Sequence, residues 1–292
     1  YRHTVLQSAT VRYSGGRFTV MARLLCSLYF NSAKDGESAR DARKLSPSAS
    51  LSYRLLKDED LYVRLSYKNI FRAPTFNESY FFHYGSTDLR PESTDQLNIG
   101  VTWEHAYGCA SYFRLSADGY INKVKDKIVA VPYNMFVWTN INVGKVNGHG
   151  VELTGTWSHR FNLRFTLLAT ANYGWQKAEN RTNEESPYYG FQLAYTPEHQ
   201  GSATVSLENP WVNVSVHGYA VSKRHANNNH YEGTDISGYA DFGLTVYRDI
   251  RLGSGILQVR GDIKNILDKQ YEIVARYPMP GRNYQISINY KF

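Results

Sequence analysis

A histidine surrounded by aromatic residues lies between residues 75 and 94. His83 belongs to the run Tyr80-Phe81-Phe82-His83-Tyr84. An imidazole can ligate haem iron, and flanking rings can stack on a macrocycle. A loop histidine that packs on its neighbours, or that bonds the backbone, would give the same pattern. The segment is therefore a candidate ligand-binding site, with His83, Tyr80 and Tyr84 as its contact residues.

A second polar segment, 222–238, holds two further histidines. His225 and His230 flank three asparagines. Two imidazoles can bind a transition metal, but such sites usually take three or four ligands in fixed geometry. We therefore favour a solvated polar loop and predict no metal site, while His225 and His230 remain candidates for ligand contact. Segment 177–197 adds rings suited to stacking on a catecholate, porphyrin or corrin surface: Tyr188, Tyr189, Phe191 and Tyr195.

Motifs of enzyme active sites are missing from the sequence. It contains no G-x-S-x-G elbow, no marked Ser/His/Asp set, no P-loop and no dinucleotide fingerprint. We therefore predict no catalytic residue, no cofactor of the protein's own and no nucleic-acid partner. The formal net charge of +7 fits attraction to anionic lipid headgroups or an acidic ligand, and equally fits scattered surface charge.

The elements that must position these residues are β-strands. Alternation of apolar and polar side chains places them on opposite faces of a strand. The pattern recurs along the chain and predicts about thirteen strands of roughly 9 to 16 residues, the length of a tilted membrane strand or slightly more. The last strand alternates to its final residue, with one face formed by Tyr284, Ile286, Ile288, Tyr290 and Phe292.

The predicted connections alternate between short and long. Short ones, rich in turn-forming residues, fall at 14–16, 57–60, 106–108, 159–162, 208–210 and 251–255. Long ones fall near 32–44, 70–94, 132–148, 177–197, 222–238 and 268–281. Outer-membrane barrels have short turns on one rim and longer loops on the other, whereas a soluble sandwich has no reason to sort its loops. Trp103, Trp157 and Trp211 lie near short turns, where an aromatic girdle is expected.

These patterns predict an all-β fold, a transmembrane antiparallel up-and-down β-barrel. A mean hydropathy of -0.48 and the lack of a long apolar run exclude a membrane-spanning helix, but barrel strands are half polar. An odd count of about thirteen strands leaves an open edge that a membrane cannot accommodate. We therefore expect residues 1–292 to be the C-terminal part of a 22-stranded barrel whose plug lies upstream. Cys26 and Cys109 are placed too differently to predict a disulfide.

Four short motifs carry a family resemblance. Together they resemble the barrel of TonB-dependent outer-membrane receptors, and the likeness runs from about residue 50 onward, with a leaning toward the Bacteroidetes branch. The motifs are Phe71-Arg72-Ala73-Pro74-Thr75, Leu89-Arg90-Pro91-Glu92, Asn265-Ile266-Leu267-Asp268-Lys269-Gln270-Tyr271 and Tyr277-Pro278-Met279-Pro280-Gly281-Arg282.

The same motifs have a structural interpretation. Pro74 cannot donate to a strand ladder and would end it. We expect Arg72 to pair with Glu78 or Glu92 and so to pin the following loop, and Asp268 to cap its own turn through its side chain. Residues 71–75 and 89–92 are therefore predicted to secure conformation rather than to touch a ligand.

The resemblance implies active import of a scarce, bulky nutrient: a ferric siderophore, haem or cobalamin, whose iron or cobalt belongs to the cargo. It implies an upstream plug pulled by the TonB complex, and a location in the outer membrane. In haem receptors of the resembled family, a histidine before an N-P-D-L box is an axial ligand. Here that box reads Ser86-Thr87-Asp88-Leu89, so only its last two positions match.

Several partners follow from the resemblance: the TonB complex, outer-membrane lipid and lipopolysaccharide, the barrel insertion machinery, which uses the terminal aromatic Phe292, and a surface lipoprotein. Basic residues near the outer rim would attract an anionic siderophore or face lipopolysaccharide phosphates: Lys223, Arg224, Arg276 and Arg282. A passive porin without energy coupling is the alternative function.

Overall fold

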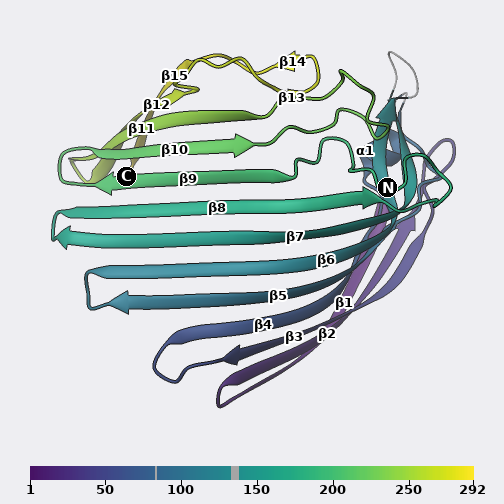
Figure 1. Ribbon diagram of the computed structural model, residues 1–292, viewed down its shortest axis with the longest axis horizontal. Helices are drawn as coiled ribbons and strands as arrows, with labels where there is room; N and C mark the ends of the chain where they lie inside the picture. The colour runs from purple at the N-terminus through teal and green to yellow at the C-terminus, as the bar shows by residue number, and fades with distance from the viewer. Residues whose placement is uncertain (83, 133–137) are drawn as a thin grey trace.

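The computed structural model describes residues 1–82, 84–132 and 138–292. Its main element is one curved antiparallel sheet of thirteen strands, in which each strand pairs with its neighbours in the chain (Figure 1). β1 and β15 form the two edges of the sheet. In order, the strands are β1 (Arg2–Gly15), β2 (Phe18–Asn31), β3 (Ala42–Arg54), β4 (Asp60–Arg72), β5 (Glu92–Tyr107), β6 (Ser111–Pro132), β7 (Trp138–Asn162), β8 (Phe165–Asn180), β9 (His199–Glu208), β10 (Asn213–Val221), β11 (Tyr239–Leu252), β12 (Gly255–Lys264) and β15 (Asn283–Lys291).

The connections are sorted as the sequence predicts. Short turns join the strands at one end of the sheet, on the left in Figure 1, and long segments join them at the other. We call these ends the turn rim and the loop rim. At the turn rim, Gly16, Gly108 and Gly253 have φ near +60°, which glycine adopts without steric cost. The long segments 73–91 and 265–282 hold the helix α1 (Phe76–Tyr80) and the hairpin of β13 (Glu272–Val274) and β14 (Tyr277–Pro278).

The prediction of a loop near 132–148 is wrong for residues 138–148, because β7 begins at Trp138, while residues 133–137 lie outside the described residues. β6 and β7 contain 22 and 25 residues, and their pairing runs from Ser111↔His159 to Pro132↔Trp138. The asparagines and glycines between residues 139 and 148 are typical of loops, yet here they belong to a continuous ladder. Asp126 has φ of +55°, and the ladder continues past it in unchanged register, from Lys125↔Lys145 to Lys127↔Val143.

The two faces of the sheet differ in chemistry. Residues paired directly across neighbouring strands share a face, so the register sorts the side chains. One face, the polar face, carries Arg64, Asp118 and Glu152 in one continuous row. The other, the apolar face, exposes at least 40% of each of these side chains: Leu65, Leu97, Ile99, Val101, Leu115, Ile121, Val151, Leu153, Val205 and Val216. Water would not favour such a band, whereas lipid would.

The closely packed part of the protein lies at the loop rim. The buried apolar side chains of the described residues sit at strand ends or in long segments there: Ala39, Ala42, Leu89, Ile128, Val146, Leu193, Val221 and Ile236. No helix within the described ranges has the length and apolar character needed to cross a membrane. Cys26 and Cys109 are both free thiols.

The turn after β12 is capped differently from the prediction. Asn265, and not Asp268, closes it, since Asn265 Oδ1 accepts a hydrogen bond from Lys269 N at 3.0 Å. Asp268 instead accepts from Arg282 N at 2.7 Å, across the segment that leads into β15. Asn265 has φ of +49° and so reaches its partners from the left-handed region that asparagine tolerates.

Candidate functional site

Arg72 stands at the centre of the first loop-rim cluster. At the end of β4, its Nε and Nη2 donate to the two carboxylate oxygens of Glu92 at 2.9 and 2.8 Å. Its Nη1 lies 2.8 Å from Glu78 Oε2 in α1. The expected pairing is thus present with both partners at once. Because Glu92 begins β5, one guanidinium ties the two strand ends to the segment between them.

The short helix α1 is fixed by a capping box. Thr75 Oγ1 accepts from Glu78 N at 3.1 Å, and Glu78 Oε2 accepts from Thr75 N at 2.7 Å. Burial raises the pKa of Glu78, but the hydrogen bonds from Arg72 and Thr75 outweigh burial and hold that pKa below its usual value of 4.5. The carboxylate therefore stays ionised and keeps α1 attached to the end of β4. Pro74, just before the cap, is buried.

The first group of predicted ligand contacts lies around α1. The hydroxyl of Tyr80 accepts a hydrogen bond from Ala39 N at 2.7 Å, which joins this segment to the loop before β3. The ring of Tyr84 packs on Phe81 with centroids 4.8 Å apart, and its carbonyl accepts from Asn140 N. Tyr80 and Phe81 still expose 40% and 53% of their surface. His83 lies outside the described residues.

The second half of the motif region is tied to β6 and β7. Leu89 is buried, and Pro91 is half-buried beside it. Arg90 pairs with Asp126 at 2.7 Å, and the Arg90 backbone exchanges two hydrogen bonds with the side chain of Asn142. Glu92 accepts a further bond from Ile128 N at 2.6 Å. The described residues of segment 73–91 thus have fixed anchors on both sides.

Phe71 and Ala73 complete the first motif. The ring of Phe71 packs against Tyr29 with centroids 5.9 Å apart, so this residue joins β4 to β2. Ala73 is half-buried between Arg72 and Pro74. The ring contact of Phe71 is made to one of the protein's own strands, as a structural role requires.

The second loop-rim cluster brings the two other predicted segments together. The rings of His225 and His230 stack with centroids 3.5 Å apart, and His230 stacks on Phe191 at 4.5 Å. Tyr188 meets the edge of Phe191 at 5.9 Å. His230 Nε2 lies 2.7 Å from the carbonyl oxygen of Gln192. Segments 177–197 and 222–238, predicted separately from the sequence, therefore form one aromatic cluster.

The histidines of this cluster already have partners within the protein. His225 Nδ1 lies 2.8 Å from Asp235 Oδ1, and Lys223 Nζ lies 2.7 Å from the other oxygen of Asp235. Hydrogen bonds from Lys223, and then from His225, hold the pKa of Asp235 below its usual range against the effect of burial. The described residues contain no group of three or more His, Cys, Asp or Glu side chains placed to hold a metal ion. Tyr189 lies at the edge of the cluster, its ring 4.8 Å from the guanidinium of Arg181.

Arg224 has a different role from the one expected. It is buried, and its Nη2 donates to the carbonyl oxygens of Glu272 and Ile273 at 2.7 and 2.9 Å. Its guanidinium also lies over the ring of Tyr239 at 5.6 Å. Arg224 therefore holds the β13–β14 hairpin against β11 and is not available to attract an anion.

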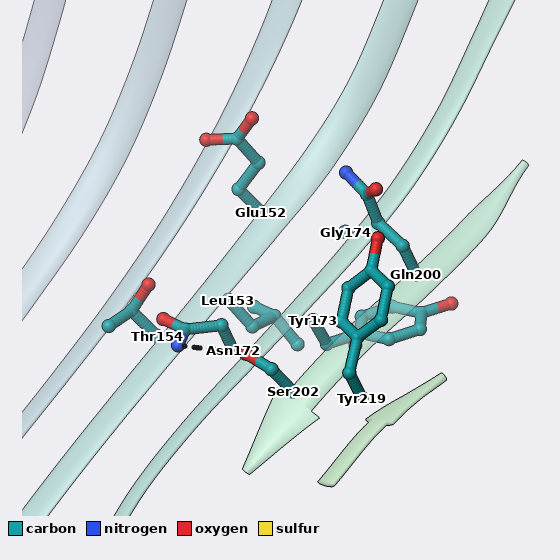
Figure 2. A pocket seen from close by; sticks show the side chains of 10 residues that line it. Glu152, Leu153, Thr154, Asn172, Tyr173, Gly174, Gln200, Ser202 and Tyr219 are labelled. Atoms are coloured by element: carbon teal, nitrogen blue, oxygen red, sulfur yellow. Dashed lines mark hydrogen bonds between the residues drawn. The ribbon is translucent and has the colours of Figure 1, made fainter. Parts of the chain in front are cut away.

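A pocket on the polar face was not foreseen from the sequence. It has a volume of about 310 Å³ and is lined by side chains of β7, β8, β9 and β10, among them Glu152, Thr154, Gln200 and Tyr219 (Figure 2). Tyr219 also meets Tyr239 edge-on at 6.1 Å. The only signal in the sequence was an aromatic residue at a polar position of the alternation in β10. The pocket offers a carboxylate, hydroxyls and amides, which suit hydrogen bonding rather than catalysis.

A family model assigns the chain to a family, and solved structures share its fold. Residues 8–266 match the family described as "TonB dependent receptor-like, beta-barrel". Among similar structures, a copper transporter, OprC, aligns with a TM-score of 0.71 and 16% identity over 98% of this chain and 48% of its own. The siderophore receptor PiuA from Acinetobacter baumannii aligns with a TM-score of 0.69, 14% identity, and coverage of 99% and 44%.

The ferric-catecholate import receptor Fiu from K12 E. coli aligns with a TM-score of 0.71 and 15% identity, covering 98% of this chain and 44% of that receptor. At these identities the structures show a shared fold. The chain spans less than half the length of each of the three. The family model, which covers most of the chain, shows that this protein belongs to the TonB-dependent receptors and forms part of their outer-membrane β-barrel.

Proposed function

We propose that this chain is the cargo-gripping and membrane-spanning part of a receptor that imports a bulky ferric complex with energy from TonB. Its family consists of transport receptors and not of enzymes. The observation that carries the proposal is the ordered loop rim, where ion pairs and hydrogen bonds hold two aromatic clusters in place. A passive pore has less use for loops anchored in this way, since it needs no gripping surface.

The first cluster supports cargo binding through its exposed rings. Phe76, Tyr80 and Phe81 expose 50%, 40% and 53% of their surface beside an ordered helix. Rings held in place lose little conformational entropy when a flat ligand stacks on them. A ferric catecholate, a porphyrin or a corrin presents such a surface. We further propose that residues 71–75 and 89–92 order this cluster and do not touch the cargo.

The second cluster supports an organic ligand over a bare metal ion. His225 is hydrogen-bonded to Asp235, and His230 is hydrogen-bonded to the Gln192 carbonyl. Each histidine therefore already uses one of its two ring nitrogens. Phe191 and the two imidazoles form a continuous stack of rings. A siderophore is the cargo best supported, and haem remains the cargo to test at His83. The similar structures include a siderophore receptor and a ferric-catecholate receptor.

The polar face supports a plug supplied by another part of the full-length receptor. Arg64 Nε, Asn98 Oδ1 and Asn122 Oδ1 are buried polar atoms for which the described residues provide no hydrogen-bond partner. Such atoms cost free energy unless something else bonds to them. All three belong to the polar face of β4, β5 and β6, opposite the apolar band. Contact with the TonB complex would follow from a plug of this kind, and the Bacteroidetes leaning and a surface lipoprotein partner remain predictions.

Ligand titration of the full-length receptor in detergent tests the proposal. Intrinsic fluorescence would be followed while ferric siderophores, hemin and cobalamin are added separately. We expect saturable quenching by a ferric siderophore, weakened at least about tenfold in Phe191→Ala, as the loss of one aromatic contact predicts. The exposed Leu163→Ala at the turn rim serves as the matched control. A Soret shift with hemin that disappears in His83→Ala would instead assign haem as the cargo.

A further inference from the structure

Four lysines gather on the apolar face where β6, β7 and β8 approach the loop rim. Their face follows from the register, which is continuous from Leu97↔Ile121 through Asp95↔Lys123 to Ser93↔Lys125. Lys125 of β6 pairs with Lys145 of β7, and His149 of β7 pairs with Lys177 of β8. We call this set, Lys123, Lys125, Lys145 and Lys177, the lysine patch. It continues the band that faces lipid and does not belong to the polar face.

The lysine patch is compensated only in part, because Asp95 attracts Lys125 without forming an ion pair with it. Lys125 and Lys145 are directly opposite each other, an arrangement that destabilises a sheet through repulsion. In the described part of the chain, none of the four has a carboxylate within ion-pairing distance. The two acidic residues on this stretch of the face are otherwise engaged: Asp95 accepts from Tyr67 and Asn69, and Glu179 pairs with Arg181 at 2.6 Å. An external anion would remove the repulsion.

The position of the patch along the strands indicates where that anion lies. On β6, the residues of the apolar face from Phe113 to Ile121 are apolar or small, and they span eight residue steps, about 27 Å along the strand. A tilted strand of this length crosses most of an apolar band of about 25 Å. Lys123 and Lys125 come next toward the loop rim, at the level of the headgroups. The ring of Trp175 lies beside that of His149, with centroids 5.6 Å apart, as expected for an interfacial aromatic.

We propose that the lysine patch binds a phosphate-bearing lipid headgroup of the outer leaflet. Its place on the lipid-facing side, just past the apolar band, selects a membrane lipid over a soluble anion or the receptor's cargo. Two facing ammonium groups can share the oxygens of one phosphate, while Lys123 and Lys177 extend the charge to either side. The lipid would thereby clamp the ends of β6, β7 and β8 together.

The test uses lipopolysaccharide as the probe and the full-length receptor freed of lipid in detergent. Native mass spectrometry would count bound lipid, and thermal unfolding would follow stabilisation. We expect phosphorylated lipopolysaccharide to bind and to raise the melting temperature. Lys125→Gln/Lys145→Gln should bind about 30-fold more weakly, the factor expected for two lysines at an anionic surface. Lys57→Gln/Lys291→Gln, with the same charge change at the turn rim, should behave as wild type.

Three outcomes would overturn the proposal. Equal binding by wild type and Lys125→Gln/Lys145→Gln would place the lipid elsewhere. Equal stabilisation by dephosphorylated lipopolysaccharide, or by free inorganic phosphate at the same concentration, would show that a phosphate-bearing lipid is not what is recognised. A less stable double variant in lipid-free detergent would show that the lysines act within the fold, because removing their repulsion should leave the lipid-free protein at least as stable.

Discussion

Arg72 and Glu92 form a two-bond ion pair that closes the junction of β4 and β5, with the Glu92 side chain only 8% exposed. A carboxylate so well buried depends on its partner, because an unpaired buried charge is costly. The same guanidinium also holds Glu78, so α1 is attached through one residue. The order of segment 73–91 therefore rests on Arg72 more than on any other side chain of the first motif.

Replacing Arg72 by alanine is expected to loosen this segment. Glu92 and Glu78 would both lose their charged partner. We therefore expect the free energy of local unfolding to fall by about 2–4 kcal/mol. The lower end of this range applies because Arg72 is partly exposed. Hydrogen exchange of the amides in 76–91 should accelerate, while the amides of β4 and β5 nearer the turn rim stay protected. Arg90→Ala is the matched control, since its pair with Asp126 is more exposed and should contribute less than about 1 kcal/mol.

The pKa of Glu78 predicts how this segment responds to acid. A carboxyl whose pKa is lowered in the folded state contributes stability above its unfolded pKa, and that stability is lost as the pH falls through the folded pKa. Protection of α1, corrected for intrinsic exchange rates, should be constant at neutral pH and fall below about pH 4. In Glu78→Gln the low-pH loss should become smaller, and the remainder should come from protonation of Glu92, the other charged partner of Arg72. A loss that begins near pH 6 would point to a histidine instead.

Pro74→Ala should weaken the order of segment 73–91 and leave barrel assembly intact. Proline restricts the conformations of the unfolded chain. Where the native backbone suits proline, replacing it lowers the free energy of unfolding by about 0.4–1 kcal/mol. Limited proteolysis should cut the variant faster within 73–91, while heat-modifiable mobility on gels stays normal. If the variant fails to insert into the membrane, Pro74 has a role in assembly that these contacts do not explain.

Asn265 should be hard to replace in the turn after β12. It is 2% exposed, adopts a left-handed φ, and bonds Lys269 N, Lys269 O and Pro280 O. Asn265→Ala loses these bonds and strains the backbone, so we expect a local loss of about 2–3 kcal/mol. Asn265→Gly relieves the strain without restoring the bonds and should recover part of that loss. Amide exchange over 266–282 measures both, and equal rates in the two variants would rule out a backbone contribution.

Much of the fold follows from the sequence because alternation is a local signal. Strand number, sheet order and the sorting of turns and loops could all be predicted from period-two patterns and turn residues. The 139–148 stretch could not, because its asparagines and glycines are typical of loops, and only the cross-strand ladder with β6 keeps them extended. Local propensity was overruled there by pairing with a neighbour.

The candidate site was predictable in part. The pairing of Arg72 with Glu78 and Glu92 followed from charge and from the end of a strand. The stacking of His230 on Phe191 did not, because it joins segments more than thirty residues apart in the chain. The burial of Arg224 beneath the β13–β14 hairpin was likewise hidden, since a basic residue in a loop is more often exposed.

Uptake of a ferric siderophore labelled with radioactive iron, by cells that carry the full-length receptor, tests the central claim most directly. Accumulation would be compared in otherwise identical cells with and without TonB, and with the proton gradient intact or collapsed. Energy-coupled import predicts concentrative uptake that is lost in either deficient condition. Uptake that continues unchanged without TonB would contradict the account and assign the barrel as a passive pore.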